Sequence, residues 1–127
     1  MNSRVMIWNK IYKADLCRKI KFVPRYHEDI SWSPIVFSFA KTIALTSEIV
    51  YEWNRIGSSQ SLDYNQHSEE WFTETYCAAV RDALERCNRD KLPLVKKMIL
   101  TCEAFNYHPG LYESVKEELE RAFVYER

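Results

Sequence analysis

The sequence predicts an all-α fold, a single domain of about four to five helices over residues 1–127. Apolar residues recur every three or four positions along most of the chain, which is the period of a helix with one buried face. The chain has only two glycines and four prolines, too few for a turn-rich β protein. Apolar residues make up 46% of the sequence, which is enough to form the core of one domain.

The first segment is basic. Residues 1–25 carry seven positive side chains and one negative side chain. Apolar spacing predicts a helix over residues 4–21. Residues 19–23 also alternate between polar and apolar side chains, a pattern compatible with a short strand. Pro24 ends either element.

The sequence contains a clear start signal for the second helix. Ser33 followed by Pro34 is typical of a helix N-cap and the first helical position. Residues 34–56 are apolar on most sides, which predicts one continuous helix at the centre of the domain. Gly57 stands where a helix-ending glycine is expected.

Three further helices are expected beyond a polar loop at 57–67. They cover residues 68–89, 92–105 and 111–125, and Ser68 caps the first of them. The short connection between the first two predicts that they pack as antiparallel neighbours.

Composition excludes several classes of function. Eighteen basic and eighteen acidic residues give a net charge of zero, which argues against an obligate binder of polyanions. Two glycines cannot supply a Gly-rich dinucleotide motif, and the P-loop pattern is absent. No serine lies in a nucleophile-elbow context. We therefore expect a protein that is not an enzyme and that needs no cofactor.

The cysteines and the apolar segments indicate a compartment. Four cysteines, at positions 17, 77, 87 and 102, show neither CxxC nor zinc-ligand spacing. Three of them fall on predicted apolar helix faces, where thiols stay reduced and inert. No apolar stretch reaches the length of a signal-peptide core or a membrane span. These patterns predict a cytoplasmic protein without a structural metal or a membrane association.

One alternative concerns DNA. Residues 40–57 resemble the helix-turn-helix of phage-repressor-type regulators. The residues that distinguish this stretch from an ordinary amphipathic helix are Ala40, Ala44 and Leu45. The usual turn glycine is missing, and Glu48 and Glu52 would lie on the recognition helix, where phosphates repel them. The resemblance implies a small DNA-binding regulator.

A third hypothesis is a metal-dependent hydrolase around His67. Its ligands would be Asp63, His67, Glu70 and Glu74, of which the last three share a helix face if the helix begins one turn early. Hard or borderline cations accept such ligands. A single histidine beside glutamates at a helix start is more often an exposed residue with favourable dipole contacts.

The preferred hypothesis is a protein-binding surface. Aromatic residues make up 14% of the chain, and Tyr and Trp near loops and helix ends commonly anchor interfaces. The loop 57–67 and the helix start after it combine such aromatics with carboxylates and no nearby cation in sequence, which favours a basic partner. The predicted binding residues are Asp63, Tyr64, Glu69, Glu70, Trp71 and Glu74.

Size, composition and the lack of catalytic motifs are typical of bacterial and phage inhibitors such as immunity proteins, antitoxins and anti-defence proteins. This is an analogy at the level of a class. It predicts a non-catalytic binding protein whose partner is another protein, for example a basic nuclease toxin, with nucleic acid as the second choice. The sequence does not fix the oligomeric state.

Overall fold

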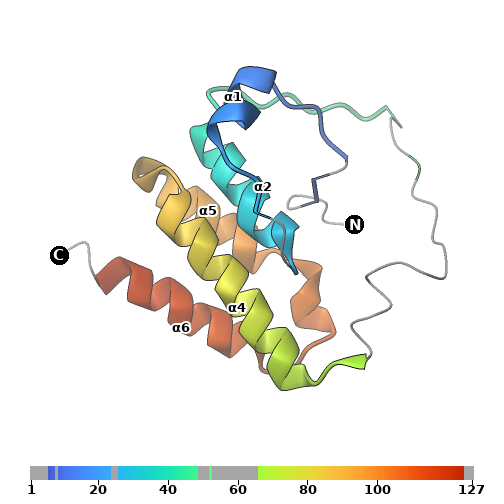
Figure 1. Cartoon of the computed structure of the whole chain (residues 1–127), viewed down its shortest axis with the longest axis vertical. Helices are drawn as coiled ribbons and strands as arrows, with labels where there is room; N and C mark the ends of the chain where they lie inside the picture. Colours follow the sequence, from blue (N-terminus) through green and yellow to red (C-terminus); the bar gives the residue numbers. More distant parts are fainter. Residues whose placement is uncertain (1–5, 8, 24–25, 49–51, 53–65, 125–127) are drawn as a thin grey trace.

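The computed structural model describes residues 6–7, 9–23, 26–48, 52 and 66–124 (Figure 1). Over these residues the chain is helical and contains no strand, so the all-α prediction is confirmed. The described residues form the α-helices α1 (Ala14–Lys19), α2 (Glu28–Phe39), α4 (Glu69–Arg86), α5 (Leu92–Leu100) and α6 (Leu111–Val124), with 3-10 turns at Arg89–Lys91 and Glu103–Asn106.

The helix predicted over 68–89 is α4. The Ser68 hydroxyl oxygen accepts a hydrogen bond from the Trp71 backbone N–H at 3.1 Å, so the predicted cap forms. The apolar stripe along this helix is buried, and it consists of Phe72, Tyr76, Val80, Ala83 and Cys87. This amphipathic pattern places α4 against the core along its whole length.

The helix predicted over 111–125 is α6, with Leu111, Val115 and Leu119 fully buried. The helix predicted over 92–105 is shorter than expected, because α5 ends at Leu100 and the chain continues in a 3-10 turn. The Thr101 hydroxyl and backbone N–H both donate to the Met98 carbonyl, at 3.0 and 3.3 Å, which closes the last turn of α5. Local hydrogen bonds from threonine compete with helix continuation in this way.

The prediction for the second element was wrong at both ends. α2 begins at Glu28, so Ser33 and Pro34 lie inside the helix. Proline in a helix interior removes one backbone hydrogen bond. Burial of almost every side of α2, including Ile30, Trp32, Ile35 and Val36, offsets that loss. Tertiary packing therefore overrides the local signal.

α2 ends at Phe39, and residues 40–48 contain no helix. Neither the continuous helix over 34–56 nor the first helix of the helix-turn-helix resemblance is present in this part of the chain. The segment is exposed, with 95% of Leu45 and 52% of Ile43 open to solvent. A short helix is stable only when an apolar face is buried, and within the described residues nothing buries this one. The rest of 34–57 beyond residue 48, apart from Glu52, lies outside the described residues.

In the basic N-terminal segment the predicted helix over 4–21 shrinks to α1, and residues 9–13 are not helical. The strand considered over 19–23 does not form. The Ile20 backbone is extended, with φ −113° and ψ 101°, but its carbonyl accepts from Trp32 Nε1–H at 3.3 Å. The Ile20 carbonyl therefore accepts its hydrogen bond from a side chain of α2, where a strand would accept one from the backbone of a neighbouring strand.

α2 and α4 run in the same direction. Near the start of α2, Ser31 Oγ donates to the Asp82 carboxylate on α4. At the end of α2, Ser38 Oγ accepts from the Asn88 backbone N–H at 2.9 Å, just beyond α4. Later positions on one helix thus meet later positions on the other, so the two helices are parallel.

α6 is also parallel to α4. His108, just before α6, contacts Glu69 in the first turn of α4, and Glu118 bonds Arg81 further along at 2.7 Å. The starts of α2, α4 and α6 therefore lie at one end of the bundle, and α5 carries the chain back to that end (Figure 1).

Candidate functional site

All three histidines of the chain lie at the end where α2, α4 and α6 begin. His27 is the N-cap residue of α2, His67 precedes the Ser68 cap of α4, and His108 lies in the turn before α6. We call this region the histidine end and define it by His27, His67, Glu69, Trp71, Phe72 and His108. The positive ends of three helix dipoles point toward it.

Phe72 is the centre of one ring cluster. The His108 ring stacks on Phe72 with 3.6 Å between ring centroids and 17° between planes. The His27 ring meets Phe72 nearly perpendicularly at 4.7 Å and lies 5.1 Å from the Tyr76 ring. Phe72 thus connects the start of α2 with the turn before α6.

Trp71 is the centre of a second ring cluster. His67 stacks on its indole at 3.8 Å, and Tyr26 meets it edge to face at 4.7 Å. Trp71 is half-buried and packs against the core. Trp71 therefore covers part of the core, and the rest of its side chain is exposed to solvent.

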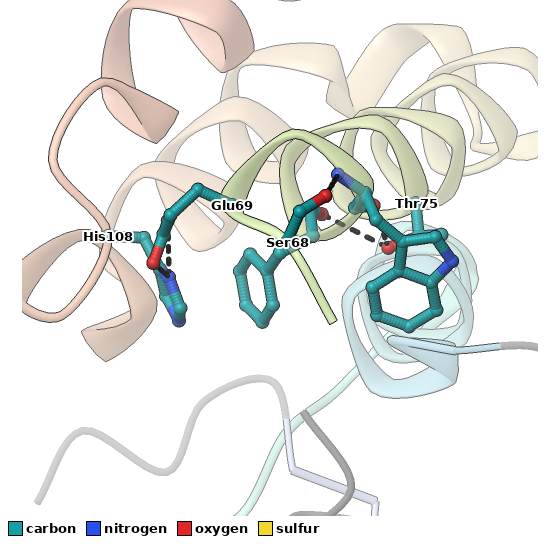
Figure 2. Close-up of polar contacts among 6 residues, drawn as sticks. Ser68, Glu69, Thr75 and His108 are labelled. Atoms are coloured by element: carbon teal, nitrogen blue, oxygen red, sulfur yellow. Dashed lines mark hydrogen bonds and ion pairs between the residues drawn. The ribbon is translucent and has the colours of Figure 1, made fainter. Parts of the chain in front are cut away.

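His108 also binds a carboxylate. Its Nδ1 lies 2.9 and 3.1 Å from the two Glu69 carboxylate oxygens, and Figure 2 shows this contact beside the Ser68 cap. The Glu69 side chain is 67% exposed, whereas the His108 side chain is 22% exposed. This contact joins the first turn of α4 to the start of α6.

Burial perturbs the titratable groups behind this surface. It lowers the pKa of His27 to about 4, and the charge of His108 lowers it further. Burial also raises the pKa of Asp29 to about 6, with the neighbouring Glu28 as the next cause. In both groups burial thus disfavours the charged form of the side chain.

The Tyr76 hydroxyl and the Cys102 thiol form a second pair of perturbed groups in this region. Burial raises the pKa of the Tyr76 hydroxyl, and its next largest neighbour effect comes from the Cys102 thiol. The pKa of Cys102 is raised by burial as well. A raised thiol pKa leaves little thiolate, so Cys102 is a poor nucleophile.

The predicted partner-binding residues fall into three groups. Glu69, Glu70 and Glu74 are exposed on α4, and Trp71 is half-buried. Within the described residues, neither Glu70 nor Glu74 forms an ion pair, whereas Glu69 pairs with His108. Asp63 and Tyr64 lie outside the described residues, as does most of the loop 57–67.

The described residues contain no group of three or more His, Cys, Asp or Glu side chains that could hold a metal ion. The set considered around His67 includes Asp63, which lies outside them. No helix in the described part of the chain is long and apolar enough to cross a membrane. All four cysteines carry free thiols, with Cys77 and Cys87 buried.

The sequence analysis did not identify His27 or His108 as candidate site residues. Their ring partners lie on α4, far away in sequence, so spacing alone did not reveal them. One signal was available, because Glu28 and Asp29 directly after His27 are typical of a helix start.

Comparisons with protein family models, with curated proteins and with solved structures give no match to this chain. The histidine end combines the exposed Glu69 carboxylate with aromatic faces and imidazoles, and Glu70 and Glu74 are exposed on the same helix. Carboxylates and aromatic rings together bind cationic side chains through charge-assisted hydrogen bonds and cation–π contacts.

Proposed function

We propose that this chain is a small, non-catalytic, cytoplasmic binding protein of the inhibitor or immunity type, and that it binds a basic protein through the start of α4. The observation that carries the proposal is the pair Glu70 and Glu74. Both are exposed, they stand one helical turn apart, and within the described residues no cation pairs with either. Like charges at this spacing destabilise a helix by about 0.2–0.5 kcal/mol.

The helix fixes the backbone positions from which these carboxylates project. The Ser68 cap fixes the first turn, and the Thr75 hydroxyl lies within hydrogen-bond distance of the Trp71 and Phe72 carbonyls, at 2.9 and 3.1 Å (Figure 2). Phe72 anchors the same turn in the core. A backbone that is already ordered before binding loses little conformational entropy when a partner docks, which supports a binding role.

The surroundings add charge and contact area. The first turn of α6, which packs beside α4, carries the exposed Glu113. Trp71, which follows Glu70 in the sequence, is half-buried, and Tyr107 in the turn before α6 is 73% exposed. An acidic field around partly exposed aromatics steers a basic partner and then anchors it.

The test begins with affinity capture of the partner from the native host. Association rates are then measured at low and high ionic strength for Glu70→Lys/Glu74→Lys. A matched control, Glu85→Lys/Glu120→Lys, makes the same change in net charge at two other exposed positions. Circular dichroism checks that both variants remain helical.

We expect the first variant to associate about tenfold more slowly or worse at low salt, and to lose most of the salt dependence. The control should retain both the rate and its salt dependence. Equal effects of the two variants would show that only net charge matters and would contradict the proposal. A contact surface mapped to residues 1–25 would also contradict it and would favour an acidic protein or nucleic acid as the partner.

A further inference from the structure

His27 has an unusual conformation for a buried residue. Its φ of 58° and ψ of 38° are left-handed, and it is the one described residue other than glycine with a positive φ. Its side chain is buried, with 6% of the residue exposed. Strained backbone of this kind persists only where the surroundings enforce it, and it is common at switching sites.

The surroundings of His27 disfavour a positive charge. The ring lies at the start of α2, where the helix dipole is positive. His108, which stacks on the same Phe72 ring, adds a second cation when it is protonated, and burial removes water from the His27 ring. Protonation of His27 therefore destabilises the buried position of its ring.

The other titratable and charged groups around this ring come from every neighbouring element. Glu69 is already bound to His108, and the Asp29 carboxylate accepts the Ile30 backbone N–H at 2.9 Å. The carboxyl pKa of Asp29, about 6, means that acid neutralises it before it protonates His27. Among the described residues, these groups include Glu28 and Asp29 of α2, Glu69 and Tyr76 of α4, Cys102 after α5, His108 before α6, and Lys10 of the N-terminal segment.

We propose that the histidine end opens locally at low pH: protonation of His27 separates the starts of α2, α4 and α6, while the opposite end of the bundle stays folded. The opposite end keeps its own contacts, because Ser38 and Asn88 hold α2 to α4 there and neither side chain titrates. This inference does not depend on the proposed partner.

The experiment is an NMR titration of the full chain from about pH 7.5 to about pH 3.5, which spans the ordinary histidine pKa and well below it. Histidine ring signals report protonation of each imidazole. Amide signals and exchange protection report opening at residues 28–31 and 69–72, with residues 95–99 of α5 as the internal reference.

Three variants accompany the wild type. His27→Asn removes the titrating ring, and asparagine accepts a left-handed backbone. His108→Gln removes the neighbouring cation and the contact with Glu69. His67→Asn is the matched control, since His67 is exposed and belongs to the same end.

In the wild type we expect the amides at the helix starts to lose protection together with His27 protonation, before residues 95–99 do so. His27→Asn should lose this local transition, and His108→Gln should shift its midpoint to higher pH. His67→Asn should leave the midpoint unchanged. One global transition of all amides in the wild type, or an unchanged local transition in His27→Asn, would overturn the proposal. If His27→Asn does not fold, an unshifted midpoint in His108→Gln would overturn it equally.

Discussion

Ser31 on α2 donates a hydrogen bond to the carboxylate of Asp82 on α4, 51 residues further along the chain. The same Asp82 oxygen lies 2.7 Å from Arg86 Nη1, and Arg86 also donates to the Lys21 carbonyl after α1. One carboxylate thus connects α2, α4 and the segment that follows α1.

Asp82→Ala should lower the free energy of unfolding by about 2 kcal/mol, because it leaves the buried Ser31 hydroxyl without this acceptor and Arg86 without its counter-charge. Urea unfolding measures the change. Asp15→Ala is the control, since it breaks an Asp–Arg pair whose side chains are 87% and 76% exposed and should cost less than about 1 kcal/mol. Equal losses in both variants would refute the role given to Asp82.

His27 and Asp29 should give stability opposite pH dependences. The folded-state pKa of His27, about 4, lies below its unfolded value of 6.5, so this group loses stability as the pH falls through that window. The folded-state pKa of Asp29, about 6, lies above its unfolded value of 3.8, so this group loses stability as the pH rises through that window. The two effects largely cancel between about pH 4 and pH 6 in the wild type.

Single variants should reveal each effect when compared with the wild type at the same pH. Asp29→Asn should become relatively more stable as the pH rises through this range, and His27→Asn relatively less stable. The slopes should approach about 1 kcal/mol per pH unit. Urea unfolding at several pH values provides the measurement, and parallel curves for all three proteins would argue against the burial of these groups.

Thr46→Pro should leave the melting temperature nearly unchanged, because residues 40–48 are exposed and not helical. Thr73→Pro, inside α4, should cost about 3 kcal/mol or more through the lost backbone hydrogen bond and a steric clash. Thermal unfolding compares the two. A strongly lowered melting temperature for Thr46→Pro would contradict this result and support the continuous helix predicted over 34–56.

Gly110 has a φ of 91° in the turn before α6, and an added Cβ would meet no atom within 4 Å. Gly110→Ala should therefore destabilise the protein through backbone strain alone, by about 1 kcal/mol. Gly110→Asn should cost less, because asparagine accepts positive φ more readily. Chemical denaturation of both variants tests this order, and an equal or reversed order would point to a cause other than backbone strain.

The helices with one apolar stripe could be predicted from the sequence. In α4 and α6 a local periodicity decides both the existence of the helix and its buried face, and Ser68 marks the start of α4. α2 could not be predicted well, because it is buried on almost every side and therefore has no stripe to mark its ends. Its local Ser33-Pro34 signal pointed to the wrong start.

Part of the candidate site could likewise be predicted from the sequence, and part could not. Exposure of Glu69, Glu70 and Glu74 follows from their positions outside the apolar stripe of α4, and the structure has them exposed. The contacts of His27 and His108 with Phe72 arise only when three parallel helices bring their starts together. No local pattern contains that information.

The parallel direction of α2 and α4 has a consequence for how the chain folds. In an up-and-down bundle each helix packs on the next one in sequence, so most contacts are local and folding is fast. Here the most buried helix meets its main partner through contacts that span 50 and 51 residues. The chain must therefore close a long loop before its core can form, and we expect it to fold more slowly than an antiparallel bundle of the same length.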